Sequence, residues 1–517
     1  MKSFLLYLSF FFSSISLLYP QDTAYLKYSG TITKEELSAH VYKLASDEME
    51  GRFTGSRGLL KAQKYILDQF EQAGLDKPEI EDKETFKQEF TLNECRWKDQ
   101  RMSIDGEDFK VGKDFLFLSD PVDLKGDFPV VFAGFGIDDP KYNDFSNIDV
   151  KGKIMLAFAS EPKDRQGFYY LSGKKEPSKK AYHFTKEKMA ADKGAEGVFI
   201  ISRYRSDYRK YLKSRDYYDP KPKITYPVKD DDVIRHKEAF SAYINVKTAA
   251  RLVDRKPGSL IQALHEMEDS LKTTAGRFSG HVSINATSDC YTVETANVIG
   301  MIEGTDLKSQ AIVVTAHYDH LGMWKGEIYH GADDNASGTS ALMELAEAFG
   351  EAARNGVRPR RTVIFLACAA EEQGLYGSKF YTQHPLIALD STYACINIDM
   401  IGRVPAKYAD DPDYISASVY LSPDLLTVSQ EALMLSAPGL EDHIEYKKSL
   451  RGGSDHYYFS KNGIPSVFYF EGFHPDYHEP TDTADKLLYD RMEQIVRAIY
   501  VTTWKLANTE KKLEIGN

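Results

Sequence analysis

Histidine and carboxylate side chains gather in short motifs in the second half of the chain. The motifs are His317-Tyr318-Asp319-His320, Gly331-Ala332-Asp333-Asp334-Asn335-Ala336-Ser337-Gly338, Glu371-Glu372, Asp399 and Tyr477-His478-Glu479. Imidazole nitrogens and carboxylate oxygens are the ligands that zinc and similar divalent ions take in proteins. Any one of these residues taken singly is more often a surface carboxylate or a hydrogen-bonded core histidine, so only their placement together can indicate a metal site.

Apolar segments that read as β-strands come directly before most of these motifs. They span residues 311–316, 362–369, 394–398 and 466–470, and such near-continuous apolar runs are typical of strands covered on both faces. Amphipathic helices alternate with them, one over 337–350, which predicts an α/β fold with a mostly parallel sheet flanked by helices. Ligands bind at the carboxyl ends of the strands in such sheets, so we expect the motifs to converge on one edge.

Two imidazoles and three or more carboxylates at one edge favour a pair of divalent metal ions. A shared carboxylate holds two such ions roughly 3.5–4 Å apart, and a bridging water then loses its proton near neutral pH. In the Glu371-Glu372 pair, one glutamate can bind metal while its neighbour transfers that proton to a leaving amine. The pattern therefore predicts a hydrolase.

The motifs resemble those of the di-zinc aminopeptidases and their relatives, the glutamate carboxypeptidases and glutaminyl cyclases. The resemblance rests on LASDEMEGRFTGSRG at 44–58, HYD at 317–319, GADDNASG at 331–338, AAEEQGLYGS at 369–378, NIDM at 397–400, SDHYYF at 454–459 and YHEPTDT at 477–483. It implies the zinc exopeptidase fold, two zinc ions and peptide substrates.

The resemblance also implies a role for each motif residue. The metal ligands would be His317, Asp334, Glu372, Asp399 and His478, with Asp334 bridging the two ions and the Asp334–Asn335 peptide bond cis. Glu371 would be the general base that activates the bridging water, and Asp319 would orient His317 through its other ring nitrogen. Tyr477 would stabilise the oxyanion, with a packing aromatic beside the site as the alternative.

Other polar residues near these motifs match no ligand position. We expect Asp333, His320 and His330 to form hydrogen bonds within loops, and Asp455 and His456 to shape the pocket.

The middle of the chain reads as strands and turns. Its segments VVFAGFGI, NIDVKGKIML and KMAADKGAEGVFIIS resemble the protease-associated domain that many secreted relatives insert into the peptidase. We therefore expect a peptidase domain over 30–118 and 279–517, interrupted by a β-rich inserted domain over 119–278. Residues 34–46 and 59–73 read as helices, the second ending at Gly74.

The composition is typical of a globular protein, and the net charge argues against a nucleic-acid-binding protein. The hydrophobic fraction of 42% and the charged fraction of 27% are those of a globular chain, and the net charge of -12 argues against nucleic acid as the main partner. Residues 1–20 read as a secretory signal peptide, with an uncleaved anchor as the alternative. We expect an exported bacterial protein, periplasmic or extracellular, with no stable membrane span after cleavage. Cys368 and Cys395 read as buried thiols, and whether Cys95 and Cys290 pair is left open.

Removal of residues from the amino end of peptides is the favoured activity. A carboxypeptidase or dipeptidase of the same family is the alternative, with Arg451 as the candidate cation for a terminal carboxylate. A glutaminyl cyclase and a non-catalytic receptor-like scaffold are less favoured, the latter because the chain keeps every ligand position and the base. The oligomeric state is not predicted.

Overall fold

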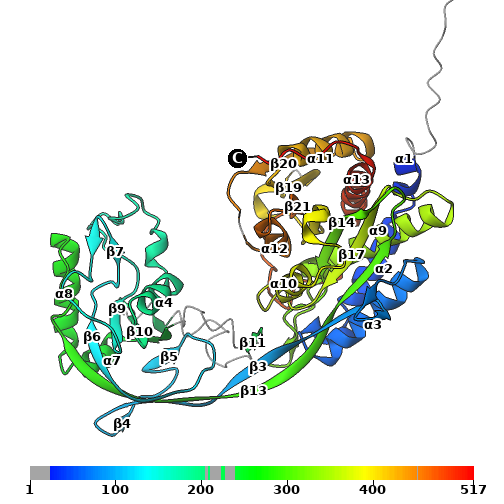
Figure 1. Cartoon of the computed structure of the whole chain (residues 1–517). Coiled ribbons are helices and arrows are strands. Elements are labelled where there is room, and N and C mark those ends of the chain that lie inside the picture. Colours follow the sequence, from blue (N-terminus) through cyan, green and yellow to red (C-terminus); the bar gives the residue numbers. More distant parts are fainter. Residues whose placement is uncertain are drawn as a thin grey trace, which may run out of the picture. The chain divides into compact units, whose positions relative to one another are not determined.

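The computed structural model describes residues 24–203, 208–209, 223–226, 239–410, 412–450 and 452–516. The predicted signal peptide and Arg451 lie outside these residues. The chain divides into two compact units (Figure 1): unit 1 comprises the residues up to Phe90 together with those from Glu294 onward, and unit 2 comprises Thr91–Val293. No helix within the described residues is both long and apolar enough to cross a membrane.

Unit 1 is built on a mostly parallel sheet. Its strands, in spatial order, are β20 (Glu441–Lys447), β19 (Tyr414–Tyr420), β21 (Ser466–Tyr469), β18 (Thr392–Ile398), β14 (Leu307–His317), β17 (Arg361–Cys368) and the last part of β13 (Ser279–Ile302). Strands β17, β14, β18 and β21 are parallel to one another, and β19 is parallel to β20, whereas β19 runs antiparallel to β21 and β13 runs antiparallel to β17. The predicted strands and the predicted α/β class are therefore confirmed.

Helices flank this sheet, which explains why its central strands are apolar throughout (Figure 1). The helices are α1 (Ala24–Ser29), α2 (Lys34–Leu44), α3 (Arg57–Gln72), α9 (Gly338–Arg354), α10 (Tyr376–Gln383), α11 (Pro423–Ser436), α12 (His456–Lys461) and α13 (Tyr489–Asn508). Helices α9 and α13 pack against β14 and β17, while α12 packs against β18 and β21 with α10 beside it. Every residue of β17 is buried.

The two predicted N-terminal helices are confirmed as α2 and α3, and side-chain caps explain where they begin. Thr33 accepts a hydrogen bond from the backbone of Glu36, and Ser56 accepts one from Leu59. Gly74 follows the end of α3 with a φ of 73°, a left-handed conformation that glycine adopts without strain.

Unit 2 has its own hydrophobic core. Its strands are the first part of β13, then β6 (Leu124–Phe132), β9 (Ile154–Phe158), β10 (Gly197–Ile201), β12 (Phe240–Ile244) and β5 (Phe115–Phe117), accompanied by helices α4 (His183–Asp192), α7 (Val246–Leu252) and α8 (Pro257–Ser270). Strand β3 (Lys87–Ile104) pairs with β13, and Cys95 is disulfide-bonded to Cys290. The unit begins at Thr91, so the predicted insert over 119–278 lies within it; its identity as a protease-associated domain stays a prediction.

Short strands complete the structure. They are β1 (Glu79–Ile80), β2 (Lys83–Glu84), β4 (Glu107–Asp108), β7 (Asp138–Asp139), β8 (Tyr142–Asn143), β11 (Lys223–Thr225), β15 (Met323–Trp324) and β16 (Glu327–Ile328).

Candidate active site

The parallel strands of unit 1 deliver the predicted site residues to one edge of the sheet. Strand β14 ends at His317, which lies in register with Cys368 at the end of β17. Asp399 follows the end of β18, the strand on the other side of β14. The side chains of His317 and Asp399 are almost completely buried, so their polar atoms must find partners inside the protein.

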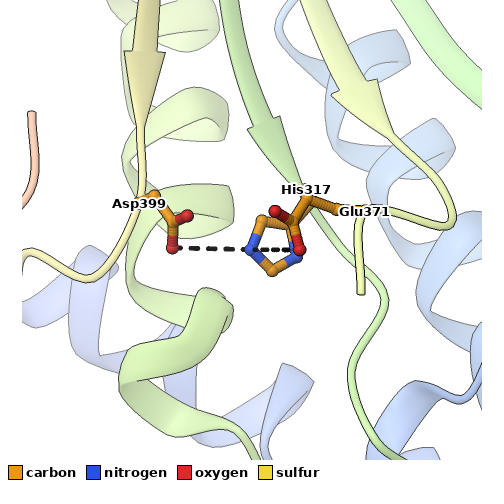
Figure 2. A group of neighbouring side chains, drawn as sticks. All are labelled: His317, Glu371 and Asp399. Carbon is orange, nitrogen blue, oxygen red and sulfur yellow. Dashed lines mark ion pairs between the residues drawn. The ribbon is translucent and has the colours of Figure 1, made fainter. Parts of the chain in front are cut away.

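The first cluster contains His317, Asp334 and Asp399, with Glu371 beside it. The Nε2 atom of His317 lies 3.4 Å from an oxygen of Asp334 and 3.4 Å from an oxygen of Asp399. It lies 3.9 Å from an oxygen of Glu371, and Figure 2 shows the imidazole between Glu371 and Asp399. Three acidic side chains thus face one imidazole nitrogen.

The second cluster contains His478, Glu372 and the other oxygen of Asp334. The Nε2 atom of His478 lies 3.0 Å from Asp334 Oδ2 and 3.3 Å from Glu372 Oε2. Asp334 therefore presents one oxygen to each cluster, which is the placement that a bridging ligand requires. His320 lies 2.8 Å through Nδ1 from Glu372 Oε1, which agrees with the hydrogen-bonding role expected for it.

The donor atoms of both clusters suit bound metal. His317 Nε2, His478 Nε2 and Asp399 Oδ1 are buried and form no hydrogen bond among the described residues. Buried polar atoms normally form hydrogen bonds, so unpaired polar atoms that face one another indicate a missing partner. Imidazole nitrogens and carboxylate oxygens are the atoms that bind zinc in proteins. The structure brings all five predicted ligands together; their binding of metal stays a prediction.

The site is strongly acidic, and this shifts the pKa of its histidines. Burial lowers the pKa of His317, but Glu371, Asp399 and Asp334 outweigh burial and raise that pKa well above its ordinary value. Burial likewise opposes a raised pKa for His478, yet Asp334 and Glu372 raise it to about 10. A divalent cation would compensate the same carboxylates and displace these protons.

Asp334 is positioned by the loop that precedes α9. The Asp334–Asn335 peptide bond is cis, as the resemblance implied. The carboxylate of Asp482 accepts hydrogen bonds from the backbone N–H of Asp333, at 3.0 Å, and of Asp334, at 3.2 Å. No role was predicted for Asp482 from the sequence, although this residue lies in the YHEPTDT motif together with His478.

Glu371 and Glu372 differ in their surroundings. Among the described residues, none donates a hydrogen bond to the Glu371 carboxylate, whereas Glu372 faces both His320 and His478. Burial raises the pKa of Glu371 well above its ordinary value, and Glu372 and Asp399 add to this while His317 opposes it. Of the two glutamates, Glu371 is therefore the one whose carboxylate has no hydrogen-bond donor among the described residues; its role as general base stays a prediction.

Asp319 lies at the other ring nitrogen of His317, as predicted, but contacts it mainly through its backbone carbonyl. The Nδ1 atom of His317 lies 3.2 Å from the backbone carbonyl of Asp319, while its carboxylate is 3.8 Å away. That carboxylate accepts hydrogen bonds from the backbone N–H of Glu371, at 3.0 Å, and from the Thr54 hydroxyl, at 3.2 Å. Asp319 thus links the His317 loop to the backbone of Glu371.

Tyr477 shows the packing contacts of its alternative interpretation. Its ring stacks on the His478 ring with centroids 3.8 Å apart and packs against Phe473 at 4.7 Å. An oxyanion-stabilising role stays a prediction.

Asp333 and His330 form the loop contacts expected of them, while pocket shaping by Asp455 and His456 stays a prediction. Asp333 accepts a hydrogen bond from Gly402 N and faces His474, while His330 Nδ1 lies 2.9 Å from the carbonyl of Ala45. Asp455 is buried, and His456 stacks between Tyr420 and Phe468.

Comparison with known proteins finds relatives of this part of the chain. Residues 297–503 match the family model of peptidase family M28. The chain is 29% identical over 224 residues to aminopeptidase YwaD of Bacillus subtilis, covering 42% of this chain and 46% of that protein. It is 29% identical over 244 residues to the probable glutamate carboxypeptidase LAMP1 of Arabidopsis thaliana, covering 43% of this chain and 34% of that protein. These matches span less than half the length of either relative.

Solved structures share the fold over nearly the whole chain. An aminopeptidase from Aneurinibacillus sp. strain AM-1 gives a TM-score of 0.61 at 19% identity, covering 95% of this chain and 98% of that structure. A zinc aminopeptidase from Bacillus subtilis gives a TM-score of 0.53 at 19% identity, covering 94% and 98%.

Proposed function

We propose that this chain is a zinc-dependent exopeptidase of peptidase family M28, whose model residues 297–503 match, and that it removes residues from the amino end of peptides. The observation that carries the proposal is the placement of Asp334, with one oxygen facing His317 and the other facing His478. That placement supports two adjacent zinc ions, one held by His317, Asp334 and Asp399 and the other by Asp334, Glu372 and His478.

Bound zinc would polarise the scissile carbonyl and lower the pKa of water, which is the chemistry that metal hydrolases use. The chain's own contribution to proton transfer is Glu371. Its carboxylate accepts no hydrogen bond from the described residues, so an Oε atom can take a proton from the attacking water and deliver it to the leaving amine. Asp319 holds the backbone of Glu371 in place meanwhile.

The charge of the site favours an amino end over a carboxyl end. Glu371, the acidic side chain of the site that is not assigned to zinc, would attract an α-ammonium group and repel a terminal carboxylate. Of the described arginines near the site, Arg52 is buried against backbone carbonyls and Arg403 is paired with Asp476.

A mixed peptide library, digested with and without a chelator and read by mass spectrometry, tests the proposal. We expect stepwise loss from the amino end that stops when the chelator is added and resumes with zinc. Loss from the carboxyl end would establish the carboxypeptidase alternative, and digestion that continues in the chelator would refute the metal mechanism.

We also propose that the protein is exported. The Cys95–Cys290 disulfide supports this, because disulfides persist in oxidising compartments and are rare in the cytosol. Alkylation of the protein at the moment its producing cells are lysed should leave only Cys368 and Cys395 to react after denaturation. Reaction of all four cysteines would contradict export.

A further inference from the structure

Arg52 is a fully buried cation whose hydrogen bonds all end on backbone carbonyls. It lies in the short segment Asp47–Arg52 between α2 and α3, and its side chain is 0% exposed. Its guanidinium donates to the carbonyl oxygens of Tyr318 at 2.9 Å, His330 at 2.8 Å and Gly331 at 2.8 Å. A further bond, of 2.5 Å, reaches Leu44 at the end of α2.

Three of those carbonyls belong to the two loops that carry metal-site residues. Tyr318 directly follows His317, and Gly331 precedes Asp334 by three residues. The backbone of the same segment adds to the contact, since the carbonyl of Arg52 accepts from His320 N at 3.1 Å. One side chain therefore ties the His317 loop to the Asp334 loop.

The backbone of residues 50–52 has an unusual conformation that places the Arg52 side chain in this position. Glu50, Gly51 and Arg52 have successive φ values of 51°, 68° and 54°, a run of left-handed residues that costs free energy for all but glycine. A Cβ atom on Gly51 would lie 2.4 Å from the carbonyl oxygen of Gly322 and 2.5 Å from that of Tyr329. Position 51 thus requires glycine both for its conformation and for close approach to the loops.

The charge of Arg52 by itself would work against a bound cation. Burial lowers the pKa of Arg52 to about 10, with Asp334 and Asp319 opposing the decrease, so the side chain stays protonated at neutral pH. A positive charge near zinc raises the free energy of zinc binding. If charge were its only effect, removing Arg52 would tighten zinc binding.

We propose that Arg52 is a positioning residue for the zinc site, holding the loops of His317 and Asp334 in the spacing that zinc needs. This inference rests on the proposed zinc site. It extends the functional centre to the N-terminal segment of unit 1, which lies outside the matched residues 297–503.

Zinc titration of the full-length, chelator-stripped protein by calorimetry tests the inference. Arg52→Lys keeps the charge but loses the planar fork that reaches several carbonyls, so we expect zinc affinity to fall about 10–100-fold, as when partners of metal ligands are removed. Arg52→Gln should also weaken zinc binding, although it removes a positive charge. Tighter binding by Arg52→Gln would show that charge alone matters and would overturn the proposal.

Arg361→Lys is the matched control. Arg361 is also buried and donates to the carbonyls of Leu506, at 3.1 Å, and Thr509, at 2.6 Å, but it starts β17, at the end opposite Glu371. It should lose stability and keep wild-type zinc affinity. Equal zinc affinity in Arg52→Lys and wild type, or an equal loss in Arg361→Lys, would overturn the proposal.

Gly51→Ala covers the case in which Arg52→Lys does not fold. It displaces the same turn while keeping Arg52, and it should weaken zinc binding in the same way; wild-type affinity in Gly51→Ala would overturn the proposal. A wild-type protein that binds no zinc would instead refute the proposed function, so the two failures are distinguishable.

Discussion

Replacing Glu371 with glutamine separates proton transfer from metal binding. The Glu371 carboxylate accepts no hydrogen bond from the described residues, and its backbone N–H is held by Asp319 at 3.0 Å. Glutamine keeps the size of the side chain and leaves that backbone contact intact. The variant should therefore fold and bind zinc like the wild type, while losing the group that takes and returns the proton.

The expected size of the effect follows from that role. General acid–base catalysis contributes about 10²–10⁴-fold to rate. At roughly 1.36 kcal/mol per factor of ten, the activation free energy should rise by about 3–5 kcal/mol in Glu371→Gln. KM should change little if Glu371 acts mainly in the transition state.

The matched control is Glu372→Gln, one residue along the chain. Glu372 faces His320 at 2.8 Å and His478 at 3.3 Å, so its replacement should weaken zinc binding as well as activity. Metal content and steady-state kinetics on a peptide substrate would be measured for both variants. Turnover of Glu371→Gln within tenfold of wild type, or loss of its zinc, would refute the role given to Glu371.

Further predictions concern positioning and stability. Asp482→Asn keeps an acceptor but loses the charge that holds the backbone of Asp334, so zinc affinity should fall about 10-fold or more in a calorimetric titration; unchanged affinity would contradict that role. Burial lowers the pKa of Lys186 from 10.5 to about 7, so between those values the unfolded chain binds more protons and the free energy of unfolding rises with pH. Lys186→Met should remove that part of the rise, measured by urea unfolding at several pH values; an unchanged slope would contradict the shift.

The sequence was sufficient for the parts of the fold that repeat a simple physical pattern. The runs that became β14, β17 and β18 are apolar because both faces of those strands are covered, and their order with helices implied parallel pairing. Because parallel strands end at one edge, the clustering of His317 and Asp399 follows from the strand pattern alone.

Contacts that end on the backbone were not predictable. Arg52 binds carbonyls of residues more than 250 positions away, and a carbonyl carries no residue-specific signal in the sequence. The same holds for Asp319, whose carboxylate meets the N–H of Glu371 while its carbonyl meets His317.

Unit 2, which spans Thr91–Val293, is longer than the insert predicted over 119–278. Strand β3 mixes buried apolar and exposed charged residues along its length, so its composition did not mark Thr91 as a boundary. A long antiparallel partner such as β13 becomes visible only when residues distant in sequence are paired.

Cys95 and Cys290 lie near the two chain ends of unit 2, and their Cα atoms are 4.1 Å apart. A segment whose entry and exit points meet can be added to a host chain without stretching the host backbone. The coding sequence for residues 91–293 can therefore be gained, lost or exchanged in a single recombination event that leaves the host strands joined by a short turn. The crosslink closes the base of this segment, so the inheritance of unit 2 need not follow that of unit 1.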